Sequence, residues 1–203
     1  MSARGFLGPV RIPHAEFLAL DLEVHALLHD VPLRDVSAID LPDGGDGRTI
    51  GDVRRLMNAG ALESTRSVRA LVGLRHVLGR IFHWDREQPE PGYAHRLSDD
   101  QRRRSLSPSG TMSGPLRLIY EFPCEMVGEA RNATVHAFSC IALRRRADGY
   151  RLYWAIYVEN VSAFTPVYMA AIEPFRRFVI YPSVLKSIRA RWTSRPATGR
   201  EGS

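Results

Sequence analysis

The C-terminal part of the chain has the hydrophobic pattern of a long amphipathic helix. From Thr165 to Trp192, apolar residues recur at steps of three and four, which places them on one side of a helix. Thr165 suits the N-cap and Pro166 the first helical position. Two interior prolines predict bends rather than breaks, because the apolar stripe continues through both. These prolines are Pro174 and Pro182, and the expected stripe consists of Ile172, Phe175, Phe178, Val179, Pro182, Leu185, Ile188 and Trp192.

Four segments before this helix predict an antiparallel sheet. Asp148-Gly149 is a strong hairpin signal between the last two of them. In these last two strands, apolar or aromatic residues occupy both alternating sets, so we expect neither face of the sheet to be exposed to solvent. Such a sheet needs a covering on each face, or one covering and a partner subunit. The predicted strands span residues 116–122, 124–130, 133–146 and 150–159.

The N-terminal part of the chain predicts shorter elements. Residues 1–30 are expected to form a lead-in with a short amphipathic helix that begins near Pro13, and residues 31–41 a first strand. Thr49, followed by Asp52, has the N-cap pattern of a short helix. A second helix is expected from residue 64 or 65 up to residue 84, because its apolar residues have a helical period.

Residues 85–115 form a polar segment rich in proline, glycine and serine. A loop of this length is uncommon in a compact domain and is usually functional or disordered. We expect a lid over a pocket or a flexible insertion, with a helical turn near residues 98–104. The chain is therefore predicted to form a single domain over residues 31–192 that contains this excursion, with a disordered tail at residues 193–203.

The order of the predicted elements is one strand, two shorter helices, several antiparallel strands and one long helix. This order is typical of an α+β protein of the helix-grip type, in which a curved antiparallel sheet wraps around the C-terminal helix. The chain resembles the bacterial family known as domain of unknown function 2867 in the stretches YEFPCEMVGEARNATVHAF, DGYRLYWAIYV, YMAAIEPFRRFVIYPSVL, VPLRDVSAIDLP and VRALVGLRHVLGRIF. That family is in turn similar to the START-like (SRPBCC) superfamily of lipid-transfer, polyketide-cyclase and plant-allergen proteins. The resemblance implies a cavity between sheet and helix, and it transfers no catalytic residue.

Length and composition predict one well-buried domain. The 203 residues are 44% hydrophobic, and no apolar run approaches the roughly 20 residues that a membrane span needs. The N-terminal residues lack the pattern of a secretory signal, so we expect a cytoplasmic protein. Cys124 and Cys140 match no metal-ligand spacing, and His25 and His29 have no third ligand nearby. We therefore predict no metal and no cofactor.

The formal charge of +6 raises the question of a nucleic-acid partner. Lys186 is the only lysine, so 27 of the 28 lysine and arginine residues are arginines. These arginines are scattered along the chain, apart from clusters at residues 102–104 and 144–146. The alternatives are a solvated surface and a patch that binds anions. We expect a solvated surface and no nucleic-acid partner.

Aromatic residues and a few polar groups on the predicted sheet and helix suit a small hydrophobic or amphipathic ligand. For each aromatic residue the alternative is ordinary core packing. In the pair Arg176-Arg177, one arginine is expected to reach solvent and the other to pair with Glu173 or with a strand glutamate. The alternative is an arginine at the mouth of a cavity that binds a ligand carboxylate. The residues expected to bind the ligand are Tyr120, His136, Phe138, Trp154, Met169, Phe175 and Arg177.

Two other functions remain open at this stage. His136, with Glu125 or Glu129 from a neighbouring strand, would form the acid–base pair of a cyclase or dehydratase, or else a structural hydrogen bond. A homodimer formed through the outer aromatic face of the sheet is the third hypothesis. Motifs for dinucleotide binding, triphosphate binding, serine hydrolysis and zinc proteolysis are absent from the sequence.

Overall fold

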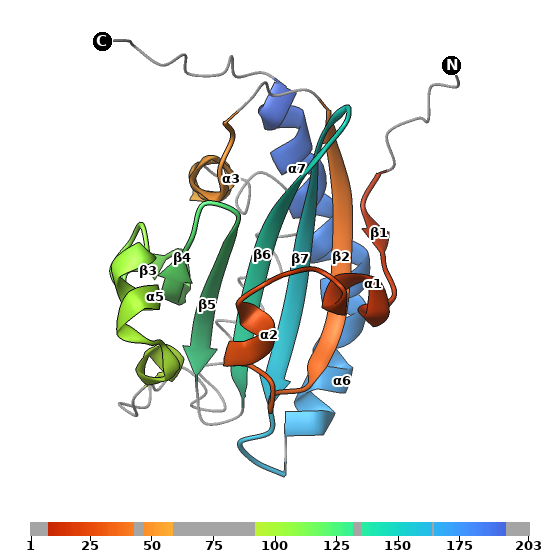
Figure 1. The fold of residues 1–203 in the computed structure, drawn as a ribbon. Helices are drawn as coiled ribbons and strands as arrows, with labels where there is room; N and C mark the ends of the chain where they lie inside the picture. Colours follow the sequence, from red (N-terminus) through yellow and green to blue (C-terminus); the bar gives the residue numbers. More distant parts are fainter. Residues whose placement is uncertain (1–7, 43–46, 59–91, 132–134, 164, 194–203) are drawn as a thin grey trace.

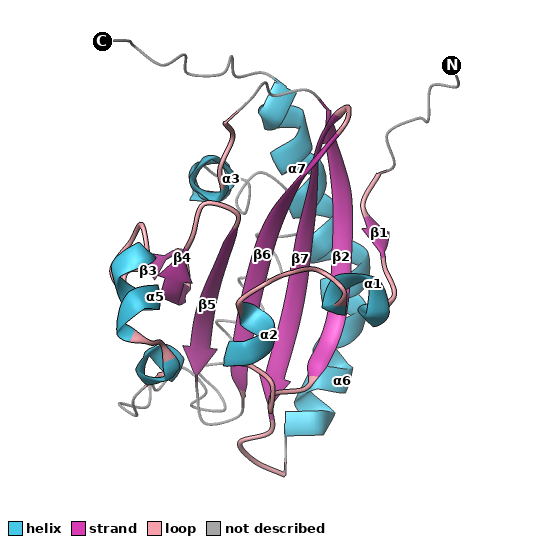
Figure 2. Ribbon diagram, in the orientation of Figure 1, coloured by secondary structure: helices cyan, strands magenta, loops and turns pink. Residues whose placement is uncertain are grey.

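The computed structural model describes residues 8–42, 47–58, 92–131, 135–163 and 165–193 (Figure 1). In these ranges the chain forms an α+β fold with one curved, seven-stranded antiparallel sheet and helices on both of its faces (Figure 2). The strand order is β1-β2-β7-β6-β5-β4-β3. The strands are β1 (Val10–Arg11), β2 (Leu33–Pro42), β3 (Met112–Ser113), β4 (Leu116–Glu121), β5 (Glu125–Arg131), β6 (His136–Arg146) and β7 (Gly149–Glu159).

The strands predicted before the C-terminal helix are confirmed as β4 to β7, with ends shifted by a few residues. Gly149 has a φ of 138°, a conformation that side chains disfavour, so glycine is suited to the β6–β7 turn. The first predicted strand is confirmed as β2, which pairs with β7 from Leu33 to Pro42. This pairing joins the first long strand to the last one, and it leaves only the two-residue strand β1 beyond β2.

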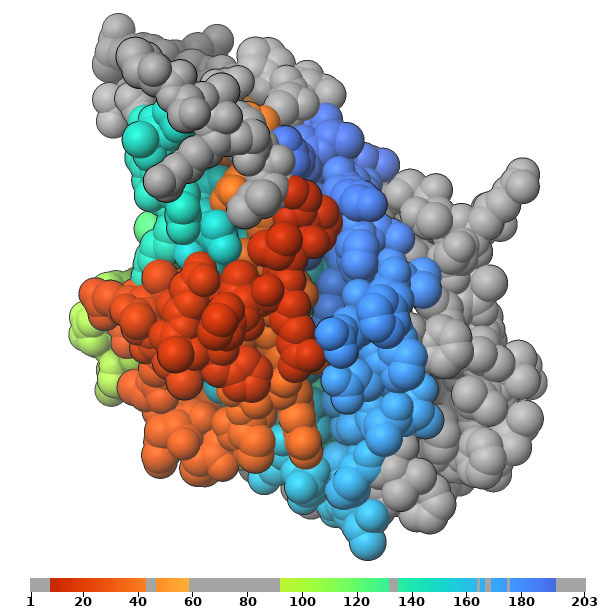
Figure 3. All heavy atoms as spheres, turned by 90° about the vertical axis from the view of Figure 1, so that its right-hand side faces the viewer, coloured from red at the N-terminus to blue at the C-terminus, as the bar shows by residue number. Residues whose placement is uncertain are grey.

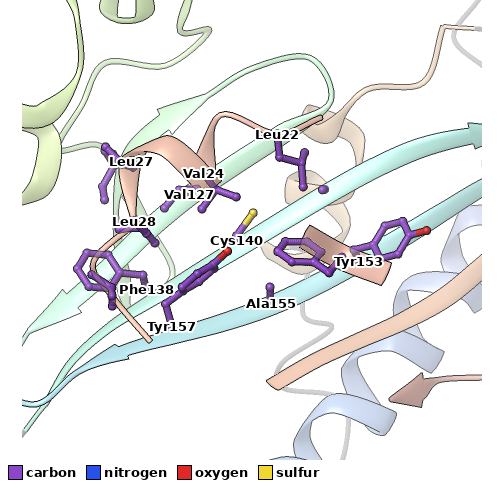
Figure 4. Close-up of a cluster of buried hydrophobic side chains, with 14 of the residues drawn as sticks. Leu22, Val24, Leu27, Leu28, Val127, Phe138, Cys140, Tyr153, Ala155 and Tyr157 are labelled. Atoms are coloured by element: carbon purple, nitrogen blue, oxygen red, sulfur yellow. The ribbon is translucent and has the colours of Figure 1, made fainter. Parts of the chain in front are cut away.

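The N-terminal part of the chain covers one face of the sheet. The covering elements are α1 (His14–Leu18) and α2 (Val24–Leu27). The 3₁₀-helix η2 (Tyr93–Arg96), which comes later in the chain, packs on the same face. The expected single helix is two helices, because Leu20, Leu22 and Val24 are spaced by two and cannot share one helix face. Figure 4 shows this cluster, with side chains of residues 22–28 above those of β5, β6 and β7. Tyr153 and Tyr157 are aromatic residues of this face of β7, the kind of face for which the sequence suggested a partner subunit, and each is 3% exposed beneath the cover.

The opposite face is covered by α3 (Ile50–Leu56) and by the C-terminal helix. That helix runs as α6 (Thr165–Phe175), a five-residue π-helix η3 (Arg176–Ile180) and α7 (Tyr181–Thr193). Beneath α7 the space is filled by side chains, because fully buried α7 residues pack on apolar residues of β2, β6 and β7. The two coverings that the sequence requires are therefore both present within one chain. The fully buried residues of α7 are Val184, Leu185, Ile188 and Trp192.

The π-helix corrects part of the expected apolar stripe. Phe178 was expected to face the core, yet it is 69% exposed. The wider turn of a π-helix, with hydrogen bonds from residue i to i+5, changes the phase of the residues that follow it. Tyr181 and Val184 therefore face the sheet. The predicted stripe is confirmed at Ile172, which packs partly buried against a core cluster, and again from Leu185 onward.

Two of the predicted helix starts, at Thr49 and near residue 98, are confirmed by capping boxes. Thr49 and Asp52 form one at α3, and Ser98 and Gln101 form another at α5 (Asp99–Arg104). The described part of the polar segment, residues 92–115, thus contains η2, α5 and β3. The helix expected up to residue 84, residues 85–91 and residues 194–203 of the expected tail lie outside the described residues. Thr193, which was expected to begin the tail, is the last residue of α7. In the described ranges no helix is both long and apolar enough to cross a membrane.

Candidate functional site

A pocket of about 160 Å³ lies between the β1–β2 edge of the sheet and the C-terminal helix. Figure 3 shows the N-terminal segment and this helix side by side on the face of the molecule where they meet. One wall comes from the chain around β1 and from β2, and the other comes from the end of α6, from η3 and from the start of α7. The lining residues are Pro9, Val10, Arg11, Asp35, Ser37, Glu173, Arg177, Phe178, Tyr181 and Pro182.

Local structure explains why these side chains converge. In β2 the alternation of a strand turns Asp35 and Ser37 toward the helix, on the same face as buried Ile39 and Leu41. In the helix the π turn leaves Arg177 and Phe178 exposed beside the sheet edge. Because β1 is only two residues long, it pairs with β2 only at Ser37 and Ala38. The pocket therefore forms where the edge of β2 is incompletely covered.

A buried ion pair stands at the base of the pocket. Arg176 Nη2 donates to Asp35 Oδ2, and Arg176 Nε donates to the Tyr181 hydroxyl at 2.7 Å. The two charged side chains are only 12% and 13% exposed. Burial raises the pKa of Asp35 above its ordinary value, while the charge of Arg176 opposes that rise. Burial likewise raises the pKa of Tyr181, so its hydroxyl keeps its proton at neutral pH.

The Asp35 carboxylate is enclosed by its protein partners. Its Oδ2 accepts from Arg176, and the Tyr181 hydroxyl also hydrogen-bonds to this carboxylate. Its Oδ1 is buried from solvent. Asp35 and Tyr181 line the pocket and are only 9% and 6% exposed, so the Asp35–Arg176–Tyr181 cluster closes the pocket on its inner side.

Exposed charges lie around this buried group. Arg11, Glu173 and Arg177 line the pocket and are exposed. Among the described residues none of the three forms an ion pair within 4.0 Å. Arg177 instead places its guanidinium carbon 5.2 Å from the centroid of the Phe178 ring. The rim therefore combines two cationic groups with one carboxylate and an exposed aromatic ring.

The sheet divides the residues expected to bind a ligand. Trp154, Met169 and Arg177 lie on the helix side, and of these only Arg177 lines the pocket. Trp154 and Met169 contact residues of the buried ion-pair cluster and are not among the lining residues. The Trp154 ring centroid is 5.0 Å from that of Tyr181, and the Met169 sulfur is 3.9 Å from Arg176 Nη1. The expected residues on the opposite face are Tyr120, His136 and Phe138, and the side chain of Phe175 lies outside the description.

His136 lies in a buried polar cluster on the N-terminal face. Its Nε2 is 2.9 Å from a Glu129 oxygen, and its Nδ1 is 2.9 Å from a Glu159 oxygen. Glu129 also accepts from the backbone N–H of Tyr93 at 3.1 Å. Sequence reasoning paired His136 with Glu129 or Glu125 and missed Glu159, which stands opposite His136 in the β6–β7 register. Both ring nitrogens thus contact carboxylates, and His136 is fully buried.

Glu125, the other expected partner of His136, has different contacts. Its carboxylate accepts from the Tyr120 hydroxyl, and it accepts from the backbone N–H of Glu23 at 3.2 Å. Burial raises the pKa of Glu125 above its ordinary value. Through these contacts the strand carboxylate holds the loop before α2 against the sheet.

The histidines considered as a metal pair are separate in the structure. The ring of His25 packs edge-on against Phe17, with centroids 5.3 Å apart. The Nδ1 of His29 lies 3.0 Å from the carbonyl oxygen of Ala26 in an exposed turn. Across the described ranges there is no group of three histidine, cysteine, aspartate or glutamate residues that could hold a metal ion.

Sequence reasoning missed the Asp35–Arg176 pair. It expected one arginine of the Arg176-Arg177 pair to reach solvent and the other to pair with a glutamate. Arg177 is exposed, but Arg176 pairs with an aspartate 141 residues away in the sequence. A signal was present in β2, where Asp35 interrupts an otherwise apolar or small set with Ser37, Ile39 and Leu41. A charge on the core-facing set of a strand implies a buried partner.

Comparison with known proteins matches the chain to a protein family. The sequence model of a family described as "Protein of unknown function (DUF2867)" matches residues 27–183, which is more than half of the chain. The match begins in α2 and ends just after the start of α7, so it spans every residue of the pocket except those at and before β1. No curated protein and no solved structure matches the chain.

Proposed function

Since the chain belongs to the DUF2867 family, we propose its function from its own geometry: it binds a small amphipathic molecule between the β1–β2 edge of the sheet and the C-terminal helix. The observation that carries this proposal is the pocket itself, which has apolar walls and exposed charged side chains at its rim. Small-molecule sites combine apolar walls with a few convergent polar groups. Here Val10, Phe178 and Pro182 supply apolar wall. The polar groups come from Arg11, Glu173 and Arg177.

We also propose that the fold is a helix-grip fold related to the START-like superfamily. The pairing of the first long strand β2 with the last strand β7 supports this relation. So does the packing of the C-terminal helix on the same sheet face. The proposed binding place is nevertheless at the side of the helix, because the space directly beneath α7 is filled by buried side chains.

The mechanism would be sequestration, driven by burial of apolar ligand surface and by contacts with the charged side chains of the rim. This process needs no catalytic group in the pocket. An acid–base reaction at His136 would need one ring nitrogen to reach a substrate, whereas both ring nitrogens contact carboxylates. The aromatic face that motivated a homodimer is covered by α1 and α2 of the same chain. Ligand binding is thus the function that the geometry favours.

We also propose a cytoplasmic location. The free cysteines Cys124 and Cys140 fit this location.

Thermal unfolding in the presence of a library of one-ring amphipathic compounds tests this function. A compound that binds the folded state raises the melting temperature. We expect at least one compound to do so for the wild type and to lose the effect in Ser37→Phe, which places a ring in the pocket. Ala147→Phe is the matched control, because it adds the same bulk at the exposed β6–β7 turn. Equal responses of wild type and Ser37→Phe, or no response to any compound, would contradict the proposal.

A further inference from the structure

The size of the pocket limits the apolar body of its ligand. Its volume of about 160 Å³ is close to that of an apolar protein cavity of about 150 Å³ that holds a single benzene ring. A sterol or a long acyl chain is much larger than this volume. The body that fits is one ring, or an aliphatic group of similar size.

The inner side of the pocket is closed by a cluster whose charges balance. Arg176 and the Tyr181 hydroxyl both hydrogen-bond to the Asp35 carboxylate, and Arg176 neutralises its charge. This cluster needs no charge from a ligand. A ligand would therefore place its apolar body inward, with Phe178 and Pro182 as wall, and its charged or polar head at the rim.

The sheet wall of the pocket supplies two hydrogen-bond donors. Arg11 on β1 lies directly opposite Ser37 on β2 in the antiparallel register, so both side chains project from the same face of the sheet. Both residues line the pocket. Within the described ranges, the Ser37 hydroxyl has no hydrogen-bond partner and Arg11 has no ion-pair partner. Burial raises the pKa of Asp35, and the charge of Arg11 opposes that rise, so Arg11 acts on the interior of the pocket.

The helix wall supplies a third donor. Arg177 follows Glu173 by four residues, a spacing at which an α-helix brings opposite charges together. These two side chains form no ion pair, because the chain between them passes into the π-helix, in which residues four apart no longer stack. Arg177 lies instead against Phe178, with its guanidinium carbon 5.2 Å from the ring centroid. A guanidinium beside an apolar ring is therefore available to a ligand.

These donors favour an anionic head. Among the exposed charges of the lining, Arg11 and Arg177 contribute two positive charges and Glu173 one negative charge, which leaves a net charge of +1 at the rim. One negative charge on the ligand balances this excess. A carboxylate also accepts two parallel hydrogen bonds from a guanidinium. A cationic head would instead meet two arginines.

We infer that the pocket binds a small monocarboxylic acid whose apolar body has the size of one ring, with its carboxylate held between Arg177 on the helix wall and Arg11 and Ser37 on the sheet wall. This inference rests on the proposed function and names its ligand class. The simplest probe of that class is benzoate. Benzyl alcohol carries a neutral head on the same ring, and benzylamine carries a cationic head.

Titration of the full ¹⁵N-labelled chain with these three probes at neutral pH, followed by amide chemical shifts, tests the ligand class on the wild type alone. We expect shifts at Val10, Ser37 and Phe178, and benzoate to bind at least about tenfold more tightly than either other probe. If the three affinities lie within about threefold of one another, the ligand class is wrong and the proposed binding function stands. The same holds if only compounds of another class shift these residues. If no compound shifts them, the binding function itself fails.

Arginine variants test where the carboxylate lies. Arg177→Gln and Arg11→Gln should each weaken benzoate binding by about tenfold and leave benzyl alcohol binding unchanged, since the apolar walls stay intact. Arg146→Gln is the matched control, because it removes the same charge from an exposed position on β6 outside the pocket lining. It should change the binding of neither probe. Equal losses of benzoate affinity in Arg177→Gln and Arg146→Gln would overturn the assignment of the carboxylate to the rim.

Discussion

Arg176 and Asp35 join the C-terminal helix to the second strand through a buried ion pair. Arg176 lies in the π-helix and donates to the Asp35 carboxylate on β2, and each side chain is nearly nine-tenths buried. A π turn is less favourable than an α turn and is found mostly as a short insertion at functional positions. Here the ion pair, together with the 2.7 Å hydrogen bond to Tyr181, holds the turn that exposes Phe178 at the pocket.

Removal of one partner of this ion pair should lower the stability of the fold. We expect Arg176→Leu to lower the free energy of unfolding by about 3 kcal/mol, because it leaves a buried carboxylate without a counter-charge. Asp35→Leu in the Arg176→Leu background should recover part of that loss. Urea unfolding of the two single variants and the double variant measures the coupling. A coupling below about 0.5 kcal/mol would show that the pair contributes nothing to the fold.

The two carboxylates that contact His136 should differ in their contribution to stability. Glu129 is 6% exposed at its side chain, and Glu159 is 40% exposed. We expect Glu129→Gln to lower the free energy of unfolding by about 1–3 kcal/mol, as for other buried charged hydrogen bonds. Glu159→Gln should cost less than about 1 kcal/mol, because solvent screens an exposed pair. Chemical denaturation of both variants tests this order, and a larger loss for Glu159→Gln would reverse it.

Gly92 is expected to be required for the position of Glu129. Its φ of −67° and ψ of 176° are open to any residue, so backbone strain plays no part. A Cβ atom at Gly92 would lie 1.7 Å from Glu129 Oε1, and that carboxylate is held by His136 and by the Tyr93 N–H. Gly92→Ala should therefore destabilise the protein by about 1–3 kcal/mol.

Gly8→Ala is the control for this change, since a Cβ atom there meets nothing within 4 Å. It should leave the melting temperature unchanged or slightly raised through the unfolded chain. Calorimetry of the two variants gives the comparison. Equal melting temperatures for Gly92→Ala and Gly8→Ala would mean that Glu129 moves aside at no cost.

Glu125 gives a pH dependence of defined sign. Burial raises its pKa in the folded state above the ordinary value of 4.5, so the folded protein keeps the proton at pH values where the unfolded chain has lost it. The stability contributed by this group is fully present below the unfolded pKa and is lost as pH rises through the folded pKa. The difference in unfolding free energy, wild type minus Glu125→Gln, should therefore fall as pH increases from about 4.

Urea unfolding of both proteins across pH 4 to 8 measures this difference at constant ionic strength. Glu125→Gln keeps an oxygen that accepts from the Tyr120 hydroxyl, so the comparison reports mainly the carboxyl proton. A difference that rises with pH would mean that the hydrogen bonds from Tyr120 and Glu23 outweigh burial.

Most strands of the sheet could be predicted from the sequence, because the patterns that indicate them are local. Alternation, the Asp148-Gly149 turn and the capping residue Thr49 each act within a few positions of the chain. Strand β1 has only two residues, too few for any period, and it was missed. The split between α1 and α2 was also missed, although the spacing by two of Leu20, Leu22 and Val24 indicates it.

The candidate site was less predictable because it depends on pairing between distant parts of the chain. Alternation sorts Trp154 and Tyr153 onto different faces but does not say which face meets the C-terminal helix. The π turn changes the helix phase after Phe178 without a proline or glycine of its own inside it. Asp35 is 141 residues from Arg176, so no local pattern links them. Among the expected ligand residues whose side chains the structure describes, only Arg177 lines the pocket.

A crystal structure of the full chain grown with a saturating compound that raises its melting temperature decides most directly whether the sheet edge and the C-terminal helix enclose a binding site. We expect electron density for the compound between Val10, Ser37 and Phe178. A pocket that stays empty while the compound occupies another part of the protein, or binds nowhere, would contradict this account.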